Sequence, residues 1–297
     1  MSYALTTPLS DLVRLRARHP EAVAEAAARR TRRPLIGDSG RLMIVAADHP
    51  ARGALAVGDR KLAMADRFDL LERLALALSR PGVDGVLGTA DILEDLLLMG
   101  ALEGKVVMGS MNRGGLAGAS FEMDDRFTGH RPQDIARLRF DCGKLLMRID
   151  YDDAGSLDTM ESTARAIDAM AERELPTFVE PFISRRVDGK VKNDLSAEAV
   201  TKSVAIASGL GGTSAYTWLK LPVTEDPEDM AQVCETSTLP TVLLGGDISA
   251  ADQDATYEKW RKALHLPTVQ GLVAGRSLLY PVDGDVAGAV DTAVSLL

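Results

Sequence analysis

Short apolar runs alternate with longer amphipathic stretches along most of this chain. From residue 41 onward, the runs that indicate strands are Leu42–Asp48, Val83–Gly88, Lys105–Ser110, Lys144–Asp150, Pro176–Phe182, Tyr216–Pro222, Pro240–Gly245 and Gln270–Gly275. Helical patterns follow them, around residues 60–80, 91–103, 131–142, 157–174, 196–209, 226–237, 253–265 and 284–297. The pattern therefore predicts about eight strand–helix units.

The predicted strands are mostly continuous apolar runs rather than strict alternations of apolar and polar residues. Such runs are typical of a parallel sheet that is covered by helices. About eight units in roughly 250 residues predict an α/β fold, a closed (β/α)8 TIM barrel over residues 41–297. The main structural alternative is an open doubly wound sheet, but no Gly-x-Gly-x-x-Gly turn follows the first strand.

The first forty residues differ from the rest, because arginines are spread there through alanine-rich sequence. They predict an N-terminal helical extension over residues 1–40, with one or two amphipathic helices placed before the barrel. We interpret the arginines as a solvated face or a contact between subunits rather than as a binding site. No long linker, low-complexity segment or obvious internal repeat divides the chain further.

The net charge of -9 and the pI of about 5.1 argue against a nucleic-acid or anionic-membrane surface. A local basic pocket for a phosphorylated metabolite is still compatible with them. No apolar stretch has the length of a signal sequence or a membrane span. The two cysteines, Cys142 and Cys234, form no metal-type or Cys-x-x-Cys pattern. We therefore expect a reduced, cytoplasmic protein, and self-association into a homo-oligomer.

Lys220 stands out as a lone lysine near the end of a buried-strand pattern, Tyr216-Thr-Trp-Leu-Lys-Leu-Pro-Val223. A lysine nearly surrounded by apolar residues is costly unless it is paired or takes part in chemistry. A buried amine tends to lose its proton and become a nucleophile. The alternative interpretation is a stem that packs inside while the amine reaches solvent at the strand end.

Carboxylates are expected near Lys220, because the C-terminal ends of the strands build the active site of such a barrel. Glu180 lies in the apolar strand Phe178-Val-Glu-Pro-Phe182, and Lys220 on the next strand is its natural partner. A structural ion pair between the two is the alternative. Asp48 ends the first strand and points into the same mouth, unless it serves only to form the turn before Pro50.

Glycine-rich turns follow the last two predicted strands, at Gly245-Gly246 and at Gly275-Arg276. Glycine lets backbone N–H groups approach a phosphate closely, and the loops after strands seven and eight are a recurrent phosphate site in this fold. Arg276 adds a charged contact. The alternative is that the glycines only form tight turns. The prediction of a phosphate site therefore depends on finding two such turns at adjacent strands.

These positions together resemble the class I aldolases of the tagatose-bisphosphate, archaeal-type fructose-bisphosphate and deoxyribose-phosphate aldolase superfamily, over about residues 41–281. The resemblance implies a TIM barrel in which Lys220 forms a Schiff base, Glu180 is the strand-five acid/base and Asp48 is the strand-one carboxylate. It also implies no metal or other cofactor, and a phosphorylated sugar as substrate, with dihydroxyacetone phosphate as one expected product.

Two positions depart from the pattern of that superfamily. The arginine that soon follows the aspartate in tagatose-type enzymes is displaced to Arg52. On strand four those enzymes place a lysine near the Schiff-base residue, and the candidates here are Lys144, early in the strand, and Arg148, closer to its mouth. We favour Arg148, whose permanent charge would lower the pKa of Lys220 and bind a substrate oxygen. Tyr151, just beyond the strand, is a further proton-donor candidate, or a residue that packs at the rim.

The sequence thus predicts a metal-independent class I aldolase that cleaves or forms a carbon–carbon bond in a phosphorylated sugar or keto-sugar acid. Two alternatives stay open, a Schiff-base dehydratase or transaldolase and a non-catalytic phosphosugar-binding barrel that needs no Lys220. A metal-dependent enzyme is disfavoured, because the four histidines lie in unrelated segments. The loop at 185–192 is interpreted as a solvated hairpin, with a mobile substrate lid as the alternative.

Overall fold

Eight parallel strands close into a barrel in the computed structural model, which describes residues 6–224, 226–246 and 253–297. Strands that follow one another in the chain lie side by side, and the β4–β5 and β1–β9 pairings complete the ring. The barrel strands are β1 (Leu42–Ala46), β2 (Gly85–Gly88), β3 (Val106–Ser110), β4 (Cys142–Ile149), β5 (Thr177–Val187), β7 (Thr217–Leu221), β8 (Thr241–Leu244) and β9 (Val269–Ala274). The predicted (β/α)8 fold is confirmed, and the open doubly wound sheet is excluded.

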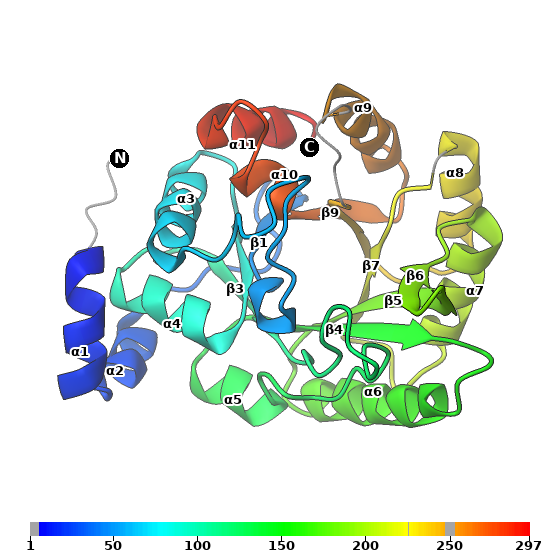
Figure 1. Ribbon diagram of the computed structural model, residues 1–297, viewed down its shortest axis with the longest axis horizontal. Helices are drawn as coiled ribbons and strands as arrows, with labels where there is room; N and C mark the ends of the chain where they lie inside the picture. Colours follow the sequence, from blue (N-terminus) through cyan, green and yellow to red (C-terminus); the bar gives the residue numbers. More distant parts are fainter. Residues whose placement is uncertain (1–5, 225, 247–252) are drawn as a thin grey trace.

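Helices surround the barrel (Figure 1). They are α3 (Arg67–Ser79), α4 (Ala90–Leu98), α5 (Pro132–Arg137), α6 (Gly155–Ala171), α7 (Ala197–Ser208), α8 (Pro227–Glu235), α9 (Gln253–Leu264), the short α10 (Arg276–Leu279) and α11 (Val286–Ser295). Side-chain caps fix where some of them begin, since Asp66 accepts from two backbone N–H groups of α3 and Ser196 from one of α7. Among the described residues, no helix is long and apolar enough to cross a membrane.

Successive side chains along each strand point alternately into the barrel and toward the helices, so the core has an inner and an outer part. On β1, Leu42 and Ile44 belong to the cluster inside the barrel, whereas Met43 and Val45 belong to the cluster beneath the helices. All four side chains are fully buried. Burial on both faces explains why the strands read as continuous apolar runs in the sequence.

The N-terminal helices pack onto the outside of the barrel. α1 (Leu12–Arg18) and α2 (Ala22–Arg29) lie beside α4, as Figure 1 shows. Arg16 of α1 donates hydrogen bonds to Asp95 at 2.7 Å and to Glu94 at 3.0 Å, both on α4. This arginine therefore holds the extension to the barrel, and the expected solvated face is wrong for it.

The segment after α2 closes the bottom of the barrel. The buried Arg30 guanidinium donates to Asp141 at 3.1 Å and to the carbonyl of Lys105 at 2.7 Å, and Arg33 pairs with Asp84. Because Asp84 and Asp141 directly precede β2 and β4, these pairs lie at the N-terminal ends of the strands. They stabilise the end of the barrel opposite to the expected active site, so a solvated face or subunit contact is wrong for these arginines as well.

Replacing Arg30 with alanine is expected to lower the free energy of unfolding by about 3 kcal/mol, because it removes one of the arginines that neutralise the buried Asp141 carboxylate. Arg29→Ala is the matched control, since the Arg29 side chain is 69% exposed and, within the described residues, pairs only with Glu25 across one helical turn. That control is expected to change stability by no more than about 0.5 kcal/mol. Denaturant unfolding measures both, and equal midpoints for the two variants would contradict the bottom-closing role of Arg30.

Candidate active site

A cavity of about 520 Å³ opens at the C-terminal ends of the barrel strands. Its wall contains predicted catalytic and phosphate-binding residues that lie on β5 and β7 or directly after β1, β8 and β9. They are Asp48, Glu180, Lys220, Gly245, Gly246, Gly275 and Arg276. Closure of the barrel brings these residues together, although they are far apart in the sequence. The cavity is therefore the candidate active site.

Glu180 of β5 lies between two lysines from the neighbouring strands. The Nζ of Lys220 on β7 donates to its Oε1, and the Nζ of Lys144 on β4 pairs with its Oε2. All three side chains are buried. The register of β5 with β7 puts Lys220 beside Glu180, whereas Lys144 lies opposite Phe178, two residues before Glu180, and its long side chain reaches along the barrel to the carboxylate. Each oxygen of the carboxylate thus faces its own amine.

The balance of burial and charge sets the ionisation of this cluster. Burial alone would raise the pKa of Glu180, but the adjacent Lys144 and Lys220 outweigh it and lower that pKa to about 2. Burial lowers the pKa of Lys144 to about 8, and Arg113 adds to the decrease, although Asp48 and Glu180 oppose it. Lys144 therefore exchanges its proton near neutral pH, where a general acid or base is most effective.

Asp48, which follows β1, connects to the same cluster. Its Oδ2 accepts a hydrogen bond from Ser110 Oγ at 3.1 Å and lies 2.7 Å from Nη2 of Arg113 and 3.5 Å from Nζ of Lys144. Burial would raise the pKa of Asp48, but Arg113 and Lys144 hold that pKa well below its usual range. Asp48 is therefore an ionised carboxylate, connected through Lys144 to Glu180.

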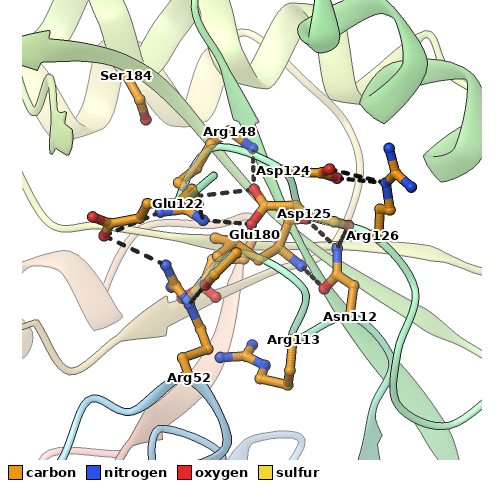
Figure 2. Close-up of polar contacts among 12 residues, drawn as sticks. Arg52, Asn112, Arg113, Glu122, Asp124, Asp125, Arg126, Arg148, Glu180 and Ser184 are labelled. Atoms are coloured by element: carbon orange, nitrogen blue, oxygen red, sulfur yellow. Dashed lines mark hydrogen bonds and ion pairs between the residues drawn. The ribbon is translucent and has the colours of Figure 1, made fainter. Parts of the chain in front are cut away.

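The structure corrects the preference for Arg148 on strand four. The Arg148 Nε and Nη2 donate to both carboxylate oxygens of Asp125, at 3.0 and 2.5 Å, as Figure 2 shows. Lys144 is the strand-four side chain that contacts Glu180. The two candidates are four residues apart, which is about 13 Å along a strand. At the height of Arg148 the nearest carboxylate belongs to the loop after β3, so its guanidinium pairs there instead of acting on Lys220.

Tyr151 also lies away from the cluster of Glu180, Lys220 and Lys144. It follows β4 in a turn, its side chain is 66% exposed, and it is not among the described residues that line the cavity. This placement does not suit a proton donor to the Lys220 region. Tyr151 lies three residues past Arg148, the last residue of β4 that faces the cavity, in the turn that leaves the strand.

Close backbone approach explains the glycines at the expected phosphate site. A Cβ atom on Gly275 would lie 2.3 Å from the carbonyl oxygen of Ala46, and one on Gly245 would lie 2.8 Å from Cβ of Ala274. Gly246 has a φ of +68°, in the left-handed region that glycine favours. The turns therefore present backbone rather than side chains to the cavity. Residues 247–252, which follow Gly246, lie outside the described part of the chain.

The hairpin after β5 covers one side of the mouth. β5 extends past the barrel and pairs antiparallel with β6 (Lys190–Asn193). Asp188 and Gly189 both have positive φ, as a two-residue hairpin turn requires. Val191, Asn193 and Leu195 line the cavity. The hairpin that the sequence analysis expected to be solvated therefore forms part of the cavity wall with one of its two faces.

Positive charge is concentrated on the cavity wall, although the chain as a whole has a net charge of -9. The lining cations are Arg52, Arg113, Lys144, Arg148, Lys220, Lys259 and Arg276, and the lining carboxylates are Asp48, Glu122 and Glu180. Such an excess in a concave site attracts an anionic ligand. Arg113 and Glu122 were not chosen as site residues from the sequence. The signal for Arg113 was its place in Ser110-Met-Asn-Arg113, at the end of the third predicted strand, and Glu122 had no such signal.

The chain matches one protein family in sequence and a group of aldolase barrels in fold. A sequence profile described as Cgl0159-like matches residues 40–294. The crystal structure of Cgl0159 from Corynebacterium glutamicum is 56% identical, with a TM-score of 0.93 and 98% of each chain covered. A search of curated proteins finds no match.

Two solved structures of archaeal fructose 1,6-bisphosphate aldolase share the fold at lower identity. One, whose catalytic lysine is covalently bound to the carbinolamine intermediate of the substrate, is 18% identical, with a TM-score of 0.68 over 92% of this chain and 98% of that one. The other is also 18% identical, with a TM-score of 0.66 over the same shares of the two chains. At this identity the likeness establishes the shared barrel fold.

Proposed function

We propose that this chain, which belongs to the Cgl0159-like family, is a class I aldolase that acts through a Schiff base on Lys220. The substrate is a phosphorylated sugar or keto-sugar acid. The observation that carries the proposal is the buried carboxylate of Glu180 between the amines of Lys220 and Lys144, at the mouth of the barrel. The fold shared with archaeal aldolases, one of them bound to its substrate through a lysine, supports it.

Imine formation is the first step of the proposed mechanism. The neutral amine of Lys220 attacks the carbonyl carbon of the substrate, the attacking nitrogen gives up one proton to Glu180, and the carbonyl oxygen takes up a proton to give a neutral carbinolamine. Lys144, whose pKa is about 8, is the proton donor suited to this step near neutral pH. A second proton transfer to the hydroxyl releases water and leaves a protonated imine on Lys220.

Carbon–carbon cleavage follows, because the protonated imine accepts electrons. A carboxylate, Glu180 or Asp48, removes the proton of the substrate hydroxyl on the far side of the bond that breaks. That oxygen forms an aldehyde, the carbon–carbon bond breaks, and its electron pair moves to the imine to form an enamine. Protonation of the enamine carbon and addition of water then release the ketone product and restore the Lys220 amine.

The glycine turns hold the substrate for this chemistry. Backbone N–H groups near Gly245, Gly246 and Gly275, together with the Arg276 guanidinium, are suited to bind its phosphate. Lys259 of α9 lines the same cavity and adds positive charge. Anchoring the phosphate fixes the carbonyl carbon near Lys220, which replaces a bimolecular encounter with an intramolecular attack.

Product analysis tests the reaction class. The protein is incubated with a panel of sugar phosphates and the products are followed by NMR. An aldolase releases two carbonyl fragments, and in deuterated water it exchanges a carbon-bound proton of dihydroxyacetone phosphate through the enamine. A dehydratase instead gives a single product that has lost water, and a transaldolase needs an acceptor aldehyde. A protein that binds the ligands but gives neither fragments nor exchange would be a phosphosugar-binding barrel.

A further inference from the structure

The loop between β3 and α5 forms the cavity wall on the side of β3 and β4. Asp125 of this loop pairs with the buried Arg148 of β4, and Arg148 also bonds the carbonyl of Glu122. A Cβ atom on Gly115 would lie 2.1 Å from that carbonyl oxygen and 2.6 Å from Nη2 of Arg148. The loop therefore closes tightly on Arg148, and Glu122 is held at the cavity wall (Figure 2).

Arg52 reaches the same loop from the short helix η2 (Pro50–Arg52) that follows β1. Its Nε donates to the carbonyl of Gly115 at 2.8 Å, whereas its Nη2 is 3.8 Å from Oε1 of Glu122, too far for a hydrogen bond. Within the described residues, Nε is the only side-chain atom of Arg52 that donates a hydrogen bond. The side chain is 16% exposed and lines the cavity, so both Nη groups have donors left for a ligand.

The charge of Arg52 is less well compensated than that of its neighbours. Arg148 has two hydrogen bonds to Asp125, and Arg113 lies 2.7 Å from Asp48. Burial, together with Arg148 and Arg113, lowers the pKa of Arg52 to about 10, although Asp125 and Glu122 oppose the decrease. Glu122 lies 3.8 Å from Nη2 of Arg52 and 3.7 Å from Nη1 of Arg148, so the two arginines share its negative charge and Arg52 is only partly compensated when no ligand is bound.

This side lies across the mouth from the expected phosphate site. The closed ring runs β1, β2, β3, β4, β5, β7, β8, β9, so β4 with Arg148 stands opposite β9, which leads to Gly275 and Arg276. Lys220, on β7, stands between them. A ligand whose phosphate binds after β9, and whose reacting carbon lies at Lys220, directs its other end toward the loop that holds Arg52.

We propose that Arg52 binds a carboxylate at the end of the substrate opposite the phosphate, which makes the substrate a phosphorylated keto-sugar acid. The inference rests on the proposed function, because it assumes the phosphate site and Lys220. A guanidinium edge with two parallel N–H groups matches a carboxylate, and its single negative charge completes the partial compensation that Glu122 gives Arg52. Glu122 repels any anion bound beside Arg52, and it repels a second phosphate with up to about two charges more strongly than a carboxylate with one. An uncharged end would leave the Nη groups of Arg52 without a charged hydrogen-bond acceptor.

Calorimetric titration of three ligands that differ only at this end tests the proposal. They are fructose 1-phosphate, with a hydroxymethyl group, fructuronate 1-phosphate, with a carboxylate, and fructose 1,6-bisphosphate, with a phosphate. A Lys220→Met background prevents turnover. We expect the carboxylate ligand to bind at least about 10-fold more tightly than fructose 1-phosphate, as a charge-assisted hydrogen bond provides. Arg52→Gln is expected to remove that preference and to leave the affinity for fructose 1-phosphate within about twofold, which also verifies folding.

Arg126→Gln is the matched control. Arg126 lies in the same loop, but its side chain is 80% exposed and pairs with Asp124, away from Arg52 and Arg148 (Figure 2). It is expected to keep the full preference for the carboxylate. Equal affinities for the three ligands, tightest binding of the bisphosphate, or a preference that survives Arg52→Gln would overturn the proposal. Whether the wild-type protein exchanges a proton of dihydroxyacetone phosphate in deuterated water tests the aldolase reaction separately. The carboxylate site and the aldolase reaction can therefore fail independently of each other.

Discussion

A Lys220→Met protein is expected to lose aldol cleavage by a factor on the order of 10⁴ to 10⁶, the loss seen when a covalent nucleophile is removed. Methionine has a similar length and keeps the strand packed, and Glu180 loses its pair with Lys220 but keeps the one with Lys144. Lys144 is not expected to replace it, because its amine lies between Glu180 and Asp48. The measurement is kcat with the best substrate of the panel.

Lys202→Met provides the control for that loss. Lys202 is half-exposed on α7 and pairs with Glu198 one turn away, so this variant is expected to keep full activity. Binding of fructose 1-phosphate to the Lys220→Met protein shows that its cavity is still formed. Residual activity above about one per cent of wild type, far more than loss of a nucleophile leaves, would assign the imine to another lysine.

A Lys144→Met protein is expected to lose kcat by about 10² to 10⁴, the usual contribution of a positioned proton donor. The pH dependence of kcat is a more specific test of Lys144 than the size of this loss. Burial lowers the pKa of Lys144 from 10.5 to about 8. A donor must be protonated, so wild-type kcat is expected to fall as the pH rises through about 8. The residual activity of the variant is expected to lack that fall.

Lys105→Met is the control for the pH profile. Lys105 is also a buried lysine, but its Nζ donates to the carbonyl of Val83 at the bottom of the barrel. Loss of that hydrogen bond is expected to lower stability, and the pH dependence of the folded variant is expected to match that of wild type. A fall of activity near pH 8 that persists in the Lys144→Met protein would show that another group titrates there.

The barrel was predictable because its strands are buried on both faces. Each predicted strand overlaps an observed one, and Leu42–Ala46 shows why, since both its inward and outward side chains are apolar. β6 was not predicted as a strand, because Lys190–Asn193 is polar and partly exposed and pairs only at the edge of β5. The bottom closure by Arg30 was also missed, since a buried arginine and a solvated one look alike until their carboxylate partners are placed.

Contacts between neighbouring strands in the candidate site were predictable, and contacts between a strand and a loop were not. Glu180 and Lys220 meet because neighbouring strands bring them to one height, which strand order alone indicates. The choice between Lys144 and Arg148 depended on Asp125, in a loop of irregular structure between β3 and α5. Such a loop has no repeating pattern of apolar residues from which its path could be predicted. Its contacts with Arg52 and Arg148 are therefore known only from the folded structure.

Covalent trapping tests the central claim most directly. The protein is treated with sodium borohydride in the presence of dihydroxyacetone phosphate, and the modified residue is located by intact-mass and peptide mass spectrometry. Reduction converts an imine into a stable secondary amine, so a single adduct on Lys220, lost in the Lys220→Met protein, is the expected result. An adduct on a different lysine, or no adduct while calorimetry shows the ligand bound, would contradict Schiff-base chemistry at Lys220.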